Sequence, residues 1–213
     1  MNTQKPNVYI VDDDQLILEL YSMMIKSNKY NVITYKSGYD FIEHYDASVS
    51  SCVLIDLNMP DIDGLSLFKK IKSLGILIPT IFISSYEYFD RIPELYREGA
   101  FDYISKPHLN SELLLSVIEN ALLYATVESV NLKKMLRCQE LFSRLTEREI
   151  GVLSLVCDGI PAKVIAKNLN ISYRTVETHI SNIKHKTQLD TSKLMSNFIF
   201  KKEYSSCHKS SQI

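Results

Sequence analysis

The sequence comprises 213 residues, of which 46% are hydrophobic and 23% charged, and its formal net charge at pH 7 is −1. This is the composition of a globular chain long enough to bury a core in one or two domains. The small net charge hides an asymmetry, because residues 1–124 sum to −7 and residues 125–213 to +6. An acidic first part and a basic second part predict two modules with different partners, the second suited to a polyanion.

Cysteine usage and the N-terminus bear on the compartment. The four cysteines, Cys52, Cys138, Cys157 and Cys207, show no Cys-x-x-Cys spacing, and at least two lie in apolar runs. Neither a disulfide framework nor a zinc site is therefore indicated. The stretch "MNTQKPN" lacks the apolar segment of a signal peptide, and no apolar run approaches the roughly 20 residues that cross a bilayer. We therefore expect a cytoplasmic protein with no membrane partner.

The first half of the chain alternates between two kinds of segment. Five short apolar runs, "NVYIV", "NVITY", "CVLI", "TIFIS" and "AFDYI", are nearly continuous in apolar residues, as are strands covered on both faces. The segments between them have helical spacing. This alternation predicts a five-stranded parallel sheet with helices on both faces.

The second half of the chain is predicted to be helical throughout. From Asn110 to about Arg144 the apolar spacing indicates a long helix that runs into a linker, with a heptad too irregular to decide for or against a coiled coil. "TERE" from Thr146 is a capping box, Gly159 closes the helix that it opens, and Ser172 caps a later one. A final helix is expected from about Thr191 to Lys201, followed by a frayed tail.

Charged residues follow three of the predicted strands. Asp12 and Asp13 follow "VYIV", Asp56 ends "CVLI", and Lys106 follows "FDYIS". Because the carboxyl ends of parallel strands form the crevice where ligands bind, these side chains are expected to meet there. Three neighbouring carboxylates repel one another, and a hard divalent cation such as Mg²⁺ relieves that repulsion.

Each of these carboxylates also has a simpler interpretation when taken alone. Residues 12–14 could form a loop cap, and Asp56 could be a turn aspartate before Pro60. Asp14 in particular is expected to cap the helix that begins near Gln15.

The motifs "VDDD", "LIDLNMPDIDG", "FISS" and "YISKP" resemble the receiver domain of two-component response regulators over about residues 5–125. The resemblance implies a flavodoxin-like α/β fold and phosphorylation of Asp56 by a histidine kinase or a phosphotransfer protein. It also implies that Asp13, Asp56 and the carbonyl of Asn58 bind Mg²⁺ directly and that Asp12 binds it through water. Lys106 would pair with the phosphoryl oxygens, and the Lys106–Pro107 bond is expected to be cis.

The same resemblance assigns a switch to Ser84 and Tyr103. The phosphoryl charge would draw Ser84 inward and leave space for Tyr103 to rotate in. The alternative is that Ser84 is a strand-end turn former and Tyr103 a core residue. A further hypothesis is that the bulk of Tyr86 obstructs the attacking water and slows dephosphorylation.

The segment "LTEREIGVLSLVCDGIPAKVIAKNLNISYRTVETHISNIKHKTQ" resembles the helix-turn-helix domain of LuxR/FixJ-type regulators. Its third helix would enter the major groove of double-stranded DNA. By this resemblance, base edges are contacted by Glu177, Thr178 and Ser181, and phosphates by Tyr173, Arg174, Thr175, Lys184 and Lys186. The final helix either forms a dimer contact in the phosphorylated protein or closes the small core, and the sequence does not decide between the two.

The sequence is therefore divided into a receiver domain (1–125), a helical linker (126–140), a helix-turn-helix domain (141–202) and a flexible tail (203–213). We expect a transcription regulator rather than an enzyme. A haloacid-dehalogenase-like phosphatase is disfavoured because Asp56-Leu57-Asn58 lacks the second carboxylate that would serve as general acid and base. A receiver with an effector domain that only binds protein stays open as the alternative.

Overall fold

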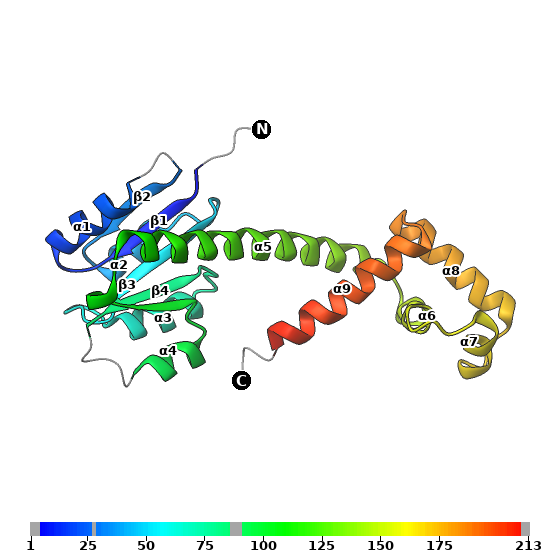
Figure 1. The fold of residues 1–213 in the computed structure, drawn as a ribbon. Coiled ribbons are helices and arrows are strands. Elements are labelled where there is room, and N and C mark those ends of the chain that lie inside the picture. Colours follow the sequence, from blue (N-terminus) through cyan, green and yellow to red (C-terminus); the bar gives the residue numbers. More distant parts are fainter. Residues whose placement is uncertain (1–4, 27–28, 86–90, 210–213) are drawn as a thin grey trace. The chain divides into compact units, whose positions relative to one another are not determined.

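The structure is a computed structural model that describes residues 5–26, 29–85 and 91–209, with side chains up to residue 205. The chain divides into two compact units, residues 1–129 and 130–213. One long helix, α5 (Ser111–Ser143), begins in the first unit and ends in the second (Figure 1). The unit boundary thus falls inside the segment expected to be a linker, because Met135 and Cys138 of α5 are buried in the second unit.

The first unit is built on five parallel strands in the order β2-β1-β3-β4-β5. The five apolar runs of the sequence form these strands, which confirms the predicted sheet: β1 (Asn7–Val11), β2 (Asn31–Tyr35), β3 (Ser51–Asp56), β4 (Thr80–Ser84) and β5 (Asp102–Ser105). Strands β1, β3 and β4 are buried along their whole length. Helices on both faces cover them, so they carry no alternation of polar residues.

Helices cover the two faces of this sheet in two groups. Helix α1 (Gln15–Ile25) and the first half of α5 pack on one face, where Leu18 and Ile118 join the core beside Ile10. Helices α2 (Gly38–His44), α3 (Gly64–Ser73) and α4 (Ile92–Glu98) pack on the other. Both faces are therefore dry, and the polar residues of the strands are confined to their ends.

The second unit is all-helical over its described residues, 130–209. It contains the end of α5 and four further helices, namely α6 (Glu147–Cys157), α7 (Ala162–Asn168), α8 (Tyr173–Thr187) and α9 (Thr191–Lys209). The capping box is confirmed: Thr146 Oγ1 accepts from the Glu149 N–H, and Glu149 accepts from the Thr146 N–H. Asn170 takes a left-handed φ of 53° between α7 and α8, and Ser172 caps α8.

Two small apolar cores hold these helices together. Val176 on α8 packs with Val152 and Ile165. Ile183, about two turns further along the same helix, packs with Leu153 and Leu194. The two residues are seven positions apart, so they share the buried face of α8.

Helix α9 extends beyond its predicted end at Lys201 and reaches Lys209. The rings of Phe200 and Tyr204 stack with their centroids 5.6 Å apart, and the Lys134 ammonium lies 4.0 Å from the Phe200 ring centroid. Aromatic and cation–π contacts of this kind stabilise the extra helical turns of a segment whose composition looks polar.

Helix α5 is long and apolar enough, by length and composition alone, to cross a membrane. Its first half, however, buries Leu114, Ile118 and Ala121 completely against the sheet. Core helices of soluble proteins have the same character, so this helix is weak evidence for a membrane span.

Candidate functional site

The ends of β1, β3 and β5 bring together two carboxylates and one ammonium. Lys106 Nζ lies 2.6 Å from Asp56 Oδ1 and 3.3 Å from Asp12 Oδ2. Asp12 and Asp56 are 3% and 6% exposed, whereas the Lys106 side chain is about one quarter exposed. Three residues distant in sequence therefore meet at the carboxyl edge of the sheet, as the strand-end pattern predicted.

Backbone groups hold the two carboxylates in place. The Asn58 N–H donates to Asp56 Oδ2 at 2.6 Å, and the Asp14 N–H donates to Asp12 Oδ1 at 2.9 Å. The loop after Asp56 folds back tightly, because the Gly64 N–H donates to the Leu57 carbonyl. A Cβ at Gly64 would lie 2.3 Å from the Asp56 carbonyl oxygen, so only glycine allows this approach.

Burial and charge perturb the ionisable groups of the site. Burial raises the pKa of Asp12, and repulsion from Asp56 adds to that rise, while the Asp14 N–H and Lys106 oppose it. Burial alone would lower the pKa of Lys106, but its hydrogen bond to Asp56 and the two carboxylate charges outweigh that effect and raise it. Lys106 therefore stays protonated at neutral pH and neutralises part of the charge of the site.

Tyr21 belongs to the same electrostatic environment, which the sequence did not indicate. It lies on α1, is 3% exposed, and interacts with the charges of Lys106, Asp12 and Asp56. Burial raises the pKa of its hydroxyl to about 12. An apolar helix face gave no signal that one of its residues would border a charged site.

The buried carboxylates of Asp12 and Asp56 are oxygen ligands of the kind that Mg²⁺ prefers. In the described part of the chain, no three His, Cys, Asp or Glu side chains are grouped closely enough to hold a metal ion. Asp13, expected to be a direct ligand, is exposed and is not gathered with Asp12 and Asp56. Mg²⁺ usually keeps several waters and takes one or two carboxylates, so two buried carboxylates beside the Asn58 backbone fit it.

The two residues of the expected switch lie on neighbouring strands beside this site. Ser84 ends β4 and is 1% exposed, and Tyr103 on β5 is half-buried against the core that includes Phe82. The pairing of Phe82 with Tyr103 and of Ser84 with Ser105 fixes their register. Tyr86 lies outside the described residues.

The expected cis peptide at Lys106–Pro107 is wrong, because no peptide bond in the described segments is cis. Pro107 lies in a single 3₁₀ turn, η2 (Lys106–His108), in which the Leu109 N–H donates to the Lys106 carbonyl. Proline is thus the second residue of a four-residue turn, a position that its fixed φ suits with a trans bond.

Helix α8 presents the expected nucleic-acid contacts on one arc. Of the three residues predicted to read base edges, Glu177, Thr178 and Ser181, all are exposed, as are the predicted phosphate contacts Tyr173, Arg174 and Lys184. Thr178 Oγ1 donates to the Arg174 carbonyl at 2.9 Å. Thr175 is half-buried, and its hydroxyl shares a hydrogen bond with Ser172, so it contributes to the helix cap.

Lys186 differs from the other predicted phosphate contacts. Its Nζ lies 2.7 Å from Glu149 Oε2, whose side chain is only 4% exposed. Burial would raise the pKa of Glu149, but hydrogen bonds from Lys186 and Thr146 outweigh it and lower the pKa. This pair joins the start of α6 to the end of α8, a partnership between residues 37 positions apart that no local pattern indicated.

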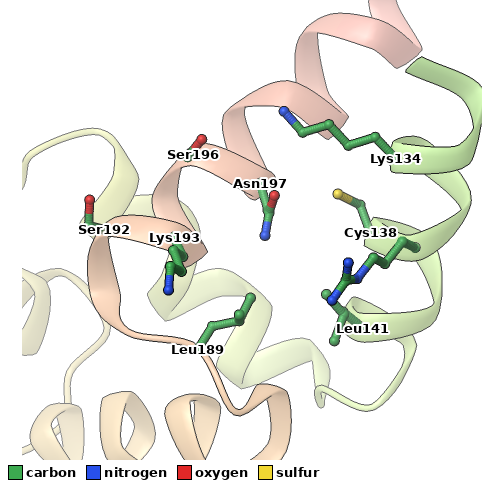
Figure 2. Close-up of a pocket in the computed structure, with 9 residues that line it drawn as sticks. Lys134, Cys138, Leu141, Leu189, Ser192, Lys193, Ser196 and Asn197 are labelled. Atoms are coloured by element: carbon green, nitrogen blue, oxygen red, sulfur yellow. The ribbon is translucent and has the colours of Figure 1, made fainter. Parts of the chain in front are cut away.

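A cavity of about 600 Å³ lies between the second half of α5 and α9. Figure 2 shows Lys134 and Cys138 on α5 facing Lys193 and Asn197 on α9. Three basic side chains, those of Lys134, Arg137 and Lys193, line the cavity, and none of the described residues that line it is acidic. Its lining therefore carries part of the positive charge of this unit.

The comparisons with known proteins cover both units. A family described as "Response regulator receiver domain" matches residues 8–119, and one described as "Bacterial regulatory proteins, luxR family" matches residues 143–192. The response regulator protein TmoT of Ectopseudomonas mendocina is 32% identical over 191 residues, covering 90% of this chain and 86% of that protein. The transcriptional regulatory protein FixJ of Rhizobium meliloti is 31% identical and covers 84% of this chain and 87% of its own.

Solved structures agree with these relatives. The response regulator StyR, known at low resolution, aligns with a TM-score of 0.72 at 28% identity and covers 92% of this chain and 98% of its own. Full-length FixJ from B. japonicum aligns with a TM-score of 0.57 at 25% identity and covers 94% and 99%. The named relatives are regulators, and none of these names describes an enzyme.

Proposed function

The chain belongs to the two-component response regulators that join a receiver domain to a LuxR-type DNA-binding domain, and it is a transcription regulator; on that premise we propose that phosphorylation of Asp56 controls its dimerisation and its sequence-specific binding to DNA. One observation carries the proposal. The Lys106 ammonium bridges Asp56 and Asp12 at 2.6 and 3.3 Å in a largely buried site. A carboxylate held in this way beside a fixed cation is prepared to receive a dianionic group.

The transfer follows from the chemistry of these residues. A carboxylate oxygen of Asp56 attacks the phosphorus of a phosphohistidine on the partner kinase or phosphotransfer protein. The P–N bond breaks as the P–O bond forms, and the donor histidine leaves as a neutral imidazole after taking up a proton. Lys106 then lies where it can pair with the phosphoryl oxygens, and the Asn58 N–H keeps the carboxylate oriented.

Receiver domains generally bind Mg²⁺ at the phosphorylation site. In this chain Asp13, Asp56 and the Asn58 carbonyl would hold the ion directly and Asp12 would hold it through water, which requires the exposed Asp13 side chain to turn inward. The ion supplies positive charge to the transferring phosphoryl oxygens.

The output steps link the two units. The phosphoryl group adds a charge of about −1.5 to −2, which would draw Ser84 towards Asp56 and admit Tyr103 to the space it leaves. A dimer formed in that state would place two copies of α8 on paired half-sites about one DNA turn apart. A coupling of 1–3 kcal/mol, the typical range, changes occupancy about 5–150-fold.

The exposed arc of α8 supports the DNA contacts. Glu177, Thr178 and Ser181 would contact base edges, with Tyr173, Arg174, Thr175 and Lys184 on phosphates. Lys186 would also contact a phosphate, and its ammonium would then interact with both Glu149 and the DNA. Members of this family are typically soluble and cytoplasmic, and we propose the same compartment here.

Selection from random-sequence duplex DNA tests the proposal. The full chain is incubated with the DNA pool with and without Mg²⁺ and beryllofluoride, a phosphoryl mimic, and the retained sequences are read. The expected result is a paired half-site motif whose enrichment rises with the mimic. Absence of enrichment in both states would refute direct DNA recognition and favour an effector domain that binds protein.

A further inference from the structure

Two serine hydroxyls in the described part of the first unit are shielded from solvent and have no hydrogen-bond partner, those of Ser84 and Ser105. Buried hydroxyls are nearly always paired, because an unpaired one has lost its hydration without compensation. Ser84 has an expected partner in the phosphoryl group, whereas Ser105 has none assigned. An unpaired group next to a functional site therefore requires an explanation of its own.

The sheet register places the two serines side by side. Ser84 and Ser105 are paired residues at the ends of β4 and β5, and Phe82 and Tyr103 are the pair two positions earlier. Side chains alternate along a strand, so Ser84, Ser105 and Tyr103 share one face of the sheet. Neighbouring strands lie about 4.8 Å apart, so the two serine side chains are close to each other. A rotation about χ1 of either serine therefore changes which neighbouring group its hydroxyl faces.

The same face carries the helix that would respond to the switch. Tyr103 packs against the core that contains Leu95 of α4. The Tyr96 hydroxyl of α4 donates to Asp102 Oδ1 at 3.0 Å, and the Tyr103 N–H donates to the same oxygen at 2.7 Å. The start of β5 is thus tied to α4, and Ser105 lies at the other end of this strand, directly before Lys106.

We propose that Ser105 is a second hydroxyl of the switch and a positioning residue for Tyr103. When the phosphoryl group draws Ser84 towards Asp56, Ser84 leaves the side of Ser105, and the Ser105 hydroxyl becomes the hydrogen-bond partner of the inward Tyr103 hydroxyl. The residue is unpaired in the resting protein and paired in the phosphorylated one. It therefore favours the active conformer, an inference that rests on the phosphorylation of Asp56 proposed above.

A thermodynamic cycle in the full chain tests this role. The apparent affinity for beryllofluoride in the presence of Mg²⁺ is measured by thermal shift for the wild type, Ser105→Ala, Tyr103→Phe and the double variant. Loss of one hydrogen bond from the active state is expected to weaken the apparent affinity about 10-fold in each single variant. The double variant should lose no more than either single one, because both substitutions remove the same interaction.

Two further measurements separate this role from a purely structural one. Ser105→Thr keeps the hydroxyl and should retain the wild-type affinity. Without beryllofluoride, Ser105→Ala should melt at the same temperature as the wild type or higher, because it removes an unpaired buried hydroxyl. A lower melting temperature would show that a bound water or another group already satisfies Ser105, which would overturn the inference.

The outcomes also distinguish this inference from the function on which it rests. A wild type that binds no beryllofluoride with Mg²⁺ would refute the proposed phosphorylation site itself. If the wild type binds beryllofluoride and Ser105→Ala binds it with equal affinity, the role of Ser105 alone is refuted. Additive losses of affinity in the double variant would refute that role as well.

Discussion

Replacing Lys186 with methionine is expected to destabilise the second unit by about 2 kcal/mol. The substitution removes the ammonium 2.7 Å from Glu149 and leaves a carboxylate that is 4% exposed. Breaking a fully buried ion pair costs about 3–5 kcal/mol. The loss is smaller here, because the Lys186 side chain is 35% exposed and Thr146 still donates two hydrogen bonds to Glu149.

Calorimetry of the full chain, with hydrogen exchange to identify which unit melts, measures this loss. For a unit of this size, 2 kcal/mol corresponds to a drop of roughly 8–16 °C in its melting temperature. Lys184→Met is the matched control, since it removes the same charge from an exposed residue of α8 for which the structure gives no ion pair. Equal stability of the two variants, within about 0.5 kcal/mol, would refute the structural role of Lys186.

Three further outcomes are expected. The second unit should lose stability in acid, because the pKa of Glu149 is lowered in the folded protein. The contribution of Glu149 to stability is complete above the ordinary glutamate pKa near 4.3 and disappears as the pH falls through the lowered value. Glu149→Gln should therefore flatten the acid limb of a curve of stability against pH. Lys184→Met should weaken DNA binding about equally for all sequences and reduce the slope of log affinity against log salt concentration by about 1. Glu177→Ala should instead change the selected DNA sequence and leave that slope unchanged, and salt titrations of both variants measure the difference. Phe82→Ala, which empties a fully buried position packed against Phe68, should cost the first unit about 3–5 kcal/mol in chemical denaturation, and a loss below 1 kcal/mol would contradict its place in the core.

The sequence predicted the sheet and the assembly of the site because both follow from local patterns. Strands buried on both faces need continuous apolar runs, and parallel strands deliver their C-terminal residues to one edge. Asp12, Asp56 and Lys106 therefore met as expected. Helix starts were equally readable, because caps such as Asp14 and Thr146 act on amides two or three residues away.

The differences arise where a contact joins residues distant in sequence. The Glu149–Lys186 pair, the extension of α9 through Phe200 and the burial of Cys138 in the second unit all depend on tertiary packing. A hydroxyl such as that of Ser105 looks ordinary in the sequence, since only the structure shows that it is shielded and unpaired. Patterns of period 2 and 3.6 identify the face of an element but not the partner that covers it.

Phosphorylation of the full chain with a small-molecule phosphodonor and Mg²⁺, followed by DNA-binding measurements, tests the central claim most directly. The wild type should gain one phosphoryl group and bind its selected DNA at least 5-fold more tightly, in line with typical coupling energies. Asp56→Asn, which keeps the size of the side chain, should gain neither the group nor the affinity. Equal phosphorylation of Asp56→Asn, or a phosphorylated wild type whose DNA affinity is unchanged, would contradict the control of transcription through Asp56.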